Sequence, residues 1–555
     1  MIGLTIALAG AGLAGFVASC SDSGTVGDGG SEADTNVGPS PLCVVSPIAA
    51  PFPTGACNSP KPSAPDAFDE ALAAIGLDRC SVQMDPKNMP QSVMNVADPR
   101  RLADFTPLLQ YPLRLPAYGN ETAKWFDDAM SGATPVTSAI AAAAERIGAP
   151  VTQCADPSWF VVDGTDPAPL ASAVGELYAA YGADFDAAGT AQLVSGVPMD
   201  LQRALVPVVR ALSAAGQAIN DARAPASGYM PRFLLAPDWV RGLAGYNWTS
   251  GQLKAFDSVN VGEMAQAALW VSSAVEAAQL ARFAGQALDP VAIDTPLGRI
   301  VLHGSGADDY EPGGGAENAL LLLDTGGDDT YRVPVGATTN THVLSVGIDL
   351  GGKDSYGYVE VPDPADGIGH RLPSDGAGRN SGISRSEVLR EGAALLGVGL
   401  LFDYGPDPDK YRSLTTSQGV GVFGVGVLYD EGGDDDYAAE SLTQGGGAWG
   451  IGLLLDKAGN DKYLAYSSAQ GFGFTKGIGG LVDEAGNDSY FTDPGDPAVG
   501  GDPLYPNAQL PGTGNTSMSQ GCGEGHRPDA PDPGYQFAGG MDVLRDAQGS
   551  DTYTT

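Results

Sequence analysis

An eight-residue phrase, D-x-x-G-x-D-x-Y, recurs through the second half of the sequence. Its clearest copies start at Asp430, Asp456 and Asp483, and their closing tyrosines lie 26 and then 27 residues apart. Self-similarity at such a period is typical of stacked repeats, each of which buries its apolar face only against its neighbours. The other copies, the first with a histidine for its first aspartate, occupy residues 303–310, 324–331, 349–356, 403–411 and 546–553. The repeat predicts a β-solenoid (β-helix) of about 26-residue coils, with the tyrosines of successive coils stacked in a column.

Between copies of the phrase, apolar residues alternate with glycine. This period of two predicts strands with one buried face. Aligning the segments on the closing aspartate predicts two apolar columns, which are Val398, Val425, Ile451 and Ile478, and Leu401, Leu428, Leu454 and Leu481. Glycine at the alternate positions is unusual for an exposed strand, so we expect another coil's backbone or an insertion loop to pack closely there. Insertions rich in Gly, Pro and Asp are expected near 362–384 and 492–540.

Each copy of the phrase carries two aspartates, and stacking would place like carboxylates in register. At the strand spacing of ~4.8 Å, two bare charges repel by about 3 kcal/mol at an effective dielectric of 20. The carboxylates therefore need to be neutralised. Backbone N–H groups of each aspartate's own turn are one device. A calcium ion between successive corners, bound by carboxylate and carbonyl oxygens, is the other.

A family resemblance bears on the second device. Gly459-Asn460-Asp461 and Gly486-Asn487-Asp488 resemble fragments of the G-G-x-G-x-D repeat of haemolysin-type (RTX) proteins, which build a calcium-filled β-roll. That family repeats every nine residues, whereas the resemblance here covers about eight residues of each coil. If calcium binds, the expected ligands are the second-position Asp329, Asp435, Asp461 and Asp488, with the first-position Asp430, Asp456 and Asp483 as partners. The layout is also similar to uncharacterised secreted bacterial repeat proteins, and this similarity implies a fold without an activity.

The N-terminus predicts export. Residues 2–19 carry no charged side chain and lead into Val17-Ala18-Ser19-Cys20, and an apolar run followed by small residues is typical of a signal peptide. The last four residues resemble the lipobox of bacterial lipoproteins. This implies that residues 1–19 are removed, that Cys20 is lipidated, and, from Ser21, that the protein is anchored at the outer membrane. An uncleaved membrane helix is the alternative, because a run of this length just reaches what a bilayer span needs. The sequence departs from a typical signal peptide in that no Lys or Arg precedes the run.

Composition divides the rest of the chain before the repeats. Residues 20–65 are dominated by Ser, Gly, Asp and Pro and predict a disordered tether. From 66 to 292, apolar residues recur at spacings of three and four, as in Leu201, Leu205, Val208 and Leu212, which predicts a domain of amphipathic helices. Together with the repeat domain, 293–555, this gives an α+β multidomain protein. Trp159, Trp239 and Trp248 are read as core anchors, with a ligand pocket as the alternative.

The six cysteines fit an exported protein. If Cys20 is lipidated, five remain, and none has the C-x-x-C spacing of a zinc or redox site. Cys43 with Cys57 is the first predicted disulfide, and Cys80 with Cys154 is the second. Cys522 is then left over, either as a free thiol or as a sign that the pairing is different.

Charge and motifs limit the function. The formal net charge of -38 argues against nucleic acid as a partner. No zinc-protease, nucleophile-elbow or phosphate-loop motif is present. We therefore expect a cell-surface lipoprotein that is a structural or binding module, adhesion-like, with a polysaccharide or another cell-surface molecule as its partner. The alternative is a β-helical carbohydrate-active enzyme, with its site in the insertions near 363–385 or 493–526.

Overall fold

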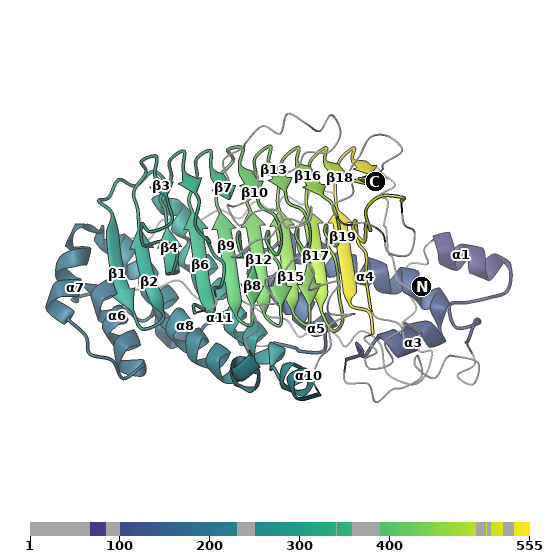
Figure 1. Cartoon of the computed structure of the whole chain (residues 1–555), viewed down its shortest axis with the longest axis horizontal. Coiled ribbons are helices and arrows are strands. Elements are labelled where there is room, and N and C mark those ends of the chain that lie inside the picture. Colours follow the sequence, from purple (N-terminus) through teal and green to yellow (C-terminus); the bar gives the residue numbers. More distant parts are fainter. Residues whose placement is uncertain are drawn as a thin grey trace, which may run out of the picture.

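The computed structural model describes residues 67–84, 100–229 without 152, 250–357 without 340, 389–495, 505, 507, 512–525 and 538–555. A helical region comes first and large sheets of mostly parallel strands follow (Figure 1). This confirms the α+β class. Several predictions fall outside the described residues: the signal peptide, lipidated Cys20, the tether, Cys43, Cys57, Trp239, Trp248 and the insertion near 362–384.

Helices form where the apolar spacing of three and four predicts them. The region also contains further helices, among them α3, α4 and α5 between α1 and α6. Leu201, Leu205 and Leu212 lie on the longest, α8, and are fully buried. The α-helices are α1 (Ala67–Ala74), α3 (Phe105–Gln110), α4 (Leu115–Met130), α5 (Pro135–Arg146), α6 (Pro169–Ala180), α7 (Ala187–Leu193), α8 (Met199–Arg223), α10 (Ser250–Asp257) and α11 (Val261–Ala278). The short 3-10 turns are η2 (Pro112–Arg114), η3 (Pro157–Phe160), η4 (Val194–Gly196), η5 (Ala224–Tyr229) and η7 (Leu280–Phe283). Within the part of the chain that the structure describes, no helix combines the length and apolarity needed to cross a bilayer.

The strands assemble into three sheets. The first has the order β1-β2-β4-β6-β9-β12-β15-β17-β19, the second β20-β18-β16-β13-β10-β7-β5-β3, and the third β14-β11-β8. The strands of the first sheet are β1 (Val291–Thr295), β2 (Gly298–Leu302), β4 (Ala319–Leu323), β6 (Leu344–Asp349), β9 (Val398–Asp403), β12 (Val425–Asp430), β15 (Ile451–Asp456), β17 (Ile478–Asp483) and β19 (Met541–Asp546). Those of the second are β3 (Asp309–Tyr310), β5 (Thr330–Tyr331), β7 (Ser355–Gly357), β10 (Lys410–Arg412), β13 (Asp436–Ala438), β16 (Lys462–Ala465), β18 (Ser489–Thr492) and β20 (Thr552–Thr554). The third contains β8 (Ala394–Leu395), β11 (Gly421–Val422) and β14 (Gly447–Ala448).

Parallel pairing keeps successive repeats in register. Asp430 pairs with Asp403 on one side and with Asp456 on the other, and both predicted apolar columns align in the same way. The tyrosines stack in one column from Tyr310 to Tyr553, with ring centroids 4.6 to 4.9 Å apart and planes within 6° of parallel. The predicted tyrosine column is therefore confirmed. The extra residue in the copy at 403–411 does not break it, because Tyr411 still pairs with Tyr356 and Tyr437.

In the strands of the first sheet, glycine occupies positions at which another backbone segment passes very close to the strand. A Cβ added at Gly452 would lie 1.9 Å from the carbonyl oxygen of Gly446, six residues earlier in the same repeat. One added at Gly426 would lie 2.0 Å from the oxygen of Val420. The close approach was predicted, but the segment responsible is the preceding stretch of the same repeat as well as a neighbouring coil.

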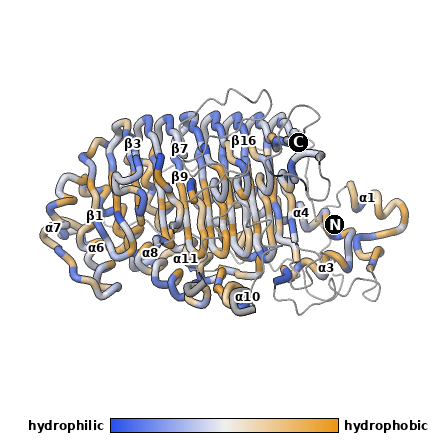
Figure 2. Tube along the Cα trace, in the orientation of Figure 1, coloured by the Kyte–Doolittle hydropathy of each residue, from blue (hydrophilic) through white to orange (hydrophobic). Residues whose placement is uncertain are grey.

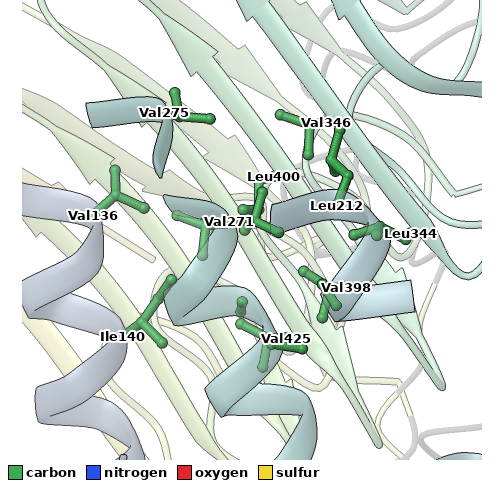
Figure 3. Packing of buried hydrophobic residues seen from close by; sticks show 14 of the residues in the cluster. Val136, Ile140, Leu212, Val271, Val275, Leu344, Val346, Val398, Leu400 and Val425 are labelled. Carbon is green, nitrogen blue, oxygen red and sulfur yellow. The ribbon is translucent and has the colours of Figure 1, made fainter. Parts of the chain in front are cut away.

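Strands β4, β6, β9, β12, β15 and β17 are buried along their whole length, so the expectation of one buried face was wrong for them, whereas β1, β2 and β19 are partly exposed. Leu428 and its column face the tyrosines, whereas Val425 and Val427 belong to the core that includes the helices. Figure 3 shows Val271 of α11 and Ile140 of α5 among valines and leucines of β6, β9 and β12. The helices thus cover the outer face of the sheet, and hydrophobic residues gather along this junction (Figure 2). The division into separate domains at 292 stays a prediction, since one hydrophobic core runs through both parts.

Candidate metal centre

The first aspartate of each phrase ends a strand of the first sheet and points into the repeat. Asp430 is fully buried, and its Oδ1 accepts a hydrogen bond from the N–H of Gly432, 2.8 Å away. Its Oδ2 accepts a hydrogen bond from the hydroxyl of Tyr411 in the preceding repeat, at 2.6 Å. Tyr437 donates to Asp456 in the same way. Asp324, Asp349, Asp430 and Asp456 thus accept hydrogen bonds both from their own turn, as one of the two predicted devices requires, and from the tyrosine column. Asp403 and Asp483 bond to the tyrosines, but their buried Oδ1 atoms have no partner.

The second aspartate of each phrase uses a different hydrogen bond. The backbone N–H of Asp435 donates to Oδ1 of Asp461 in the next repeat, at 2.7 Å, and the N–H of Asp461 donates to Oδ1 of Asp488, at 2.8 Å. The same bond links every successive pair, which are Asp308–Asp329, Asp329–Asp354, Asp354–Asp409, Asp409–Asp435 and Asp488–Asp551. The second carboxylates therefore join neighbouring repeats through one oxygen each.

The other oxygen of these carboxylates has no partner. Oδ2 is buried and makes no hydrogen bond in Asp329, Asp354, Asp435, Asp461 and Asp488. At most 2% of each of these residues is exposed, so solvent does not replace the missing donor. A buried carboxylate oxygen left in this way costs free energy unless a proton or a cation binds it.

Carboxylates from adjacent repeats converge in threes. In each group one ligand oxygen per residue lies within 4.8 Å of the others, as in Asp435, Asp456 and Asp461. The same arrangement brings together Asp329, Asp349 and Asp354; Asp354, Asp403 and Asp409; and Asp409, Asp430 and Asp435. These clusters of buried aspartates could hold a metal ion, and Asp354, Asp409 and Asp435 each take part in two adjacent groups.

Burial and mutual repulsion raise the pKa of these carboxyl groups. Loss of solvent, together with the charge of Asp430, raises the pKa of Asp435 to about 10. Loss of solvent raises the pKa of Asp461 to about 8, and hydrogen bonding from Asp435 opposes the shift. Among the described residues, no lysine or arginine forms an ion pair with the first-position or the second-position aspartates. The basic side chain that contacts one of them is His303, which lies beside Asp308. Among the residues that the structure describes, the all-aspartate clusters therefore have no lysine or arginine as a counter-charge.

All seven aspartates predicted as calcium ligands lie in these two sets. The structure brings together Asp430 with Asp435, and Asp456 with both Asp435 and Asp461. The prediction left out further members, and the phrase itself was the signal for them: Asp308, Asp324, Asp349, Asp354, Asp403, Asp409, Asp546 and Asp551 occupy the same two positions of other copies.

A column of glutamines also links neighbouring repeats, through hydrogen bonds to backbone carbonyls near the tyrosine column. Gln418, Gln444 and Gln470 adopt left-handed backbone angles, with φ between 51° and 54°. The side-chain amide of Gln444 donates to the carbonyl of Tyr437 in its own repeat and to that of Leu464 in the next. Glu391 takes this position in an earlier repeat, where burial raises its pKa to about 7. The predicted site residues did not include it.

The remaining predicted residues lie elsewhere. Trp159 packs edge-on against Trp270, with ring centroids 6.1 Å apart, and contacts the main core. Cys80 and Cys154 are both disulfide-bonded, and the predicted pairing of the cysteines stays a prediction. Cys522 carries a free thiol, and burial raises its pKa to about 12.

Comparison of this chain with protein-family models, with curated proteins and with solved structures found no match. The geometry of the acidic columns is therefore the basis on which a function can be proposed.

Proposed function

We propose that residues 293–555 form a β-solenoid whose successive repeats are held together by calcium ions, and that it serves as a structural or binding module at the cell surface. The observation that carries the proposal is the series of buried, unpartnered Oδ2 atoms of the second-position aspartates. They lie beside first-position carboxylates of the next repeat. Hard oxygen ligands of this kind are those that calcium prefers.

Charge balance supports a divalent ion. Each repeat adds two buried carboxylates, so one dication per repeat neutralises them. Without an ion, neighbouring carboxylates at the strand spacing of ~4.8 Å repel by about 3 kcal/mol per pair at an effective dielectric of 20. Protonation is the other escape, and the raised pKa values are its signature in the absence of an ion. Backbone carbonyls and water complete the six to eight ligands that calcium takes.

The solenoid itself is supported by the course of each repeat. One repeat supplies β11, β12 and β13, and each of these strands pairs in parallel with its equivalents one repeat before and after. Additional parallel bridges link Thr415, Ser441 and Ser467 of successive repeats. Such nearest-neighbour stacking is what stabilises repeat proteins.

The location of the module is a proposal from the N-terminal sequence. A lipid on Cys20 would anchor the protein to the membrane, most simply the outer membrane, and residues 20–65 would hold the folded part away from it. The acidic surface favours a partner other than nucleic acid, and a polysaccharide or another cell-surface molecule is the proposed class.

Thermal unfolding of the purified protein in calcium and in EGTA tests the ion. A site that binds only the folded state adds about 2.7 kcal/mol at a ligand concentration 100 times its Kd, so several filled sites give a large rise in the midpoint. Magnesium is the control cation, because it demands a smaller, more regular site. A midpoint equal in calcium and EGTA would refute the calcium proposal.

A pair of matched variants locates the effect. Asp461→Asn keeps an oxygen for the N–H of Asp435 but removes a buried charge from the group with Asp435 and Asp456. Asp434→Asn removes an exposed charge one residue away from the cluster. We expect the first variant to lose part of the calcium-dependent rise in the midpoint and the second to keep all of it. Equal behaviour of the two would contradict the placement of the ion.

A carbohydrate-active enzyme is the second candidate. Glu391 is buried beside Arg390 and does not belong to the aspartate repeat. In the sequence it follows the insertion near 363–385, which is outside the described residues. Hydrolysis or elimination measured on a panel of polysaccharides, with Glu391→Gln as the comparison, tests this alternative. Activity that the variant loses would favour the enzyme over the module.

A further inference from the structure

The first copy of the repeat differs from the others in one ligand. His303 follows β2 at the position where later copies carry the first aspartate. Its ring lies beside that of Tyr310, with centroids 5.0 Å apart, at the start of the tyrosine column. The acidic columns therefore begin with an imidazole in place of a carboxylate.

The imidazole faces two carboxylates. His303 Nδ1 lies 3.0 Å from Oδ2 of Asp308, and one ligand oxygen of Asp324 lies within 4.8 Å of both residues' ligand atoms. Nδ1 is buried yet makes no hydrogen bond. A separation of 3.0 Å lets both atoms bind one dication and is also the length of an ordinary ion pair. Tetrahedral zinc ligands at about 2.1 Å and right-angled calcium ligands at about 2.4 Å are both about 3.4 Å apart, so the donor atoms, and not this distance, decide the metal.

A fourth group points to a bound ion. Asp329 is 2% exposed, and its Oδ1 accepts the N–H of Asp308 while its Oδ2 has no hydrogen-bond partner. A simple ion pair between His303 and Asp308 would satisfy those two side chains but would give this buried oxygen no cation, and the carboxyl group of Asp324 is its neighbour. Because Oδ1 of Asp329 accepts the N–H of Asp308, the Asp329 carboxylate lies beside the cluster.

We propose that His303, Asp308 and Asp324, with Asp329 beside them, bind a first-row transition-metal dication such as Mn²⁺, Co²⁺ or Zn²⁺ in preference to calcium. A neutral imidazole nitrogen raises affinity for these metals, whereas calcium prefers all-oxygen sites. The site therefore differs in selectivity from the all-aspartate groups of later repeats. Asp329 is shared with the all-aspartate group that contains Asp349 and Asp354, whereas His303, Asp308 and Asp324 belong to none of the all-aspartate groups named above. The His303 variants therefore test this site separately from the calcium proposal.

Cobalt is the probe, because Co²⁺ bound by nitrogen and oxygen ligands absorbs visible light. The full chain is loaded with Co²⁺, dialysed against calcium in large excess, and analysed for metal content and for its visible spectrum. His303→Asp, which restores the residue of the other repeats, is the test variant, and His303→Gln is a second one. His342→Asn is the control, because His342 contacts Thr339 and Thr341 instead of the cluster.

We expect the wild-type protein and His342→Asn to retain one Co²⁺ per chain, and both His303 variants to bind it at least tenfold more weakly. Circular dichroism checks that each variant is folded. Wild-type protein that retains no cobalt, or His303 variants that retain as much as wild type, would overturn the proposal. Retained cobalt without any effect of calcium on unfolding would instead refute calcium binding in the later repeats and leave this site standing.

Discussion

Removing one hydroxyl from the centre of the tyrosine column should destabilise the protein measurably. In Tyr437→Phe the ring remains stacked between Tyr411 and Tyr463, whose centroids lie 4.7 and 4.9 Å away. The change deletes the 2.6 Å hydrogen bond from the hydroxyl to Oδ2 of fully buried Asp456. Leaving a buried acceptor without its donor costs about 1 to 3 kcal/mol, and a charged acceptor costs more. We therefore expect a loss of about 2 to 3 kcal/mol in the free energy of unfolding.

Tyr553→Phe is the matched control. Tyr553 donates the same kind of hydrogen bond to Asp546, at 2.9 Å, but 46% of the residue is exposed. Water replaces the lost donor there, so we expect a change below about 0.5 kcal/mol. Urea unfolding followed by the fluorescence of buried Trp449 and by circular dichroism measures both variants. Equal losses in the two variants would refute the reasoning, because burial would then not decide the cost.

Three further predictions concern backbone approach, the helical layer and pH. Gly452→Ala forces a Cβ to 1.9 Å from a carbonyl oxygen, so its melting temperature should fall by several degrees, whereas Gly164→Ala, with nothing within 4 Å, should leave it unchanged. Val271→Ala in α11 should cost about 2 kcal/mol, and helical and strand signals should still be lost in one calorimetric transition, since two separated transitions would contradict a shared core. In EGTA, stability should fall as pH rises from 5 to 9, because the folded pKa values of Asp461 and Asp435, about 8 and about 10, exceed the unfolded value of about 3.9; urea midpoints that rise with pH would contradict this.

The parts of the fold that follow from the repeat period were predictable from the sequence. The tyrosine column and the columns of Val425 and Leu428 needed only the alignment of copies, because stacked repeats keep like residues in register. The cover over the outer face was not predictable. Amphipathic spacing in α11 shows that one face is buried, yet it does not say which element Val271 contacts. The period of two led to the wrong expectation of one buried face for the central strands, because it does not show that residues such as Val425 pack against helices while the glycines meet backbone on the other face.

The acidic site was predictable in its members but not in its bonding. The phrase marks both aspartates of each copy, and two neutralising devices were compatible with it. In the structure the first aspartate uses its own turn, as Asp430 does with Gly432, whereas the second bonds to the backbone of the preceding repeat. Which aspartate bonds within its own turn and which bonds to the neighbouring repeat depends on the spacing between repeats, and the sequence does not give that spacing. His303 stood in the first copy as a plain substitution, and its position between Asp308 and Asp324 came from the stacking.

The helical layer covers the array of repeats along its length. Different helices contact successive strands along the first sheet. From one end, α6 and α7 contact β1, α8 contacts β6, α11 contacts β9 and β12, and α5 contacts β15. Arg545 of β19 then forms an ion pair with Asp127 of α4. Duplicating one 26-residue coil would preserve every bond between neighbouring repeats, but it would shift β19 from α4 and leave the valines of one strand uncovered. The number of repeats is therefore matched to the length of the helical layer, and adding a repeat would require additional helical residues to cover it.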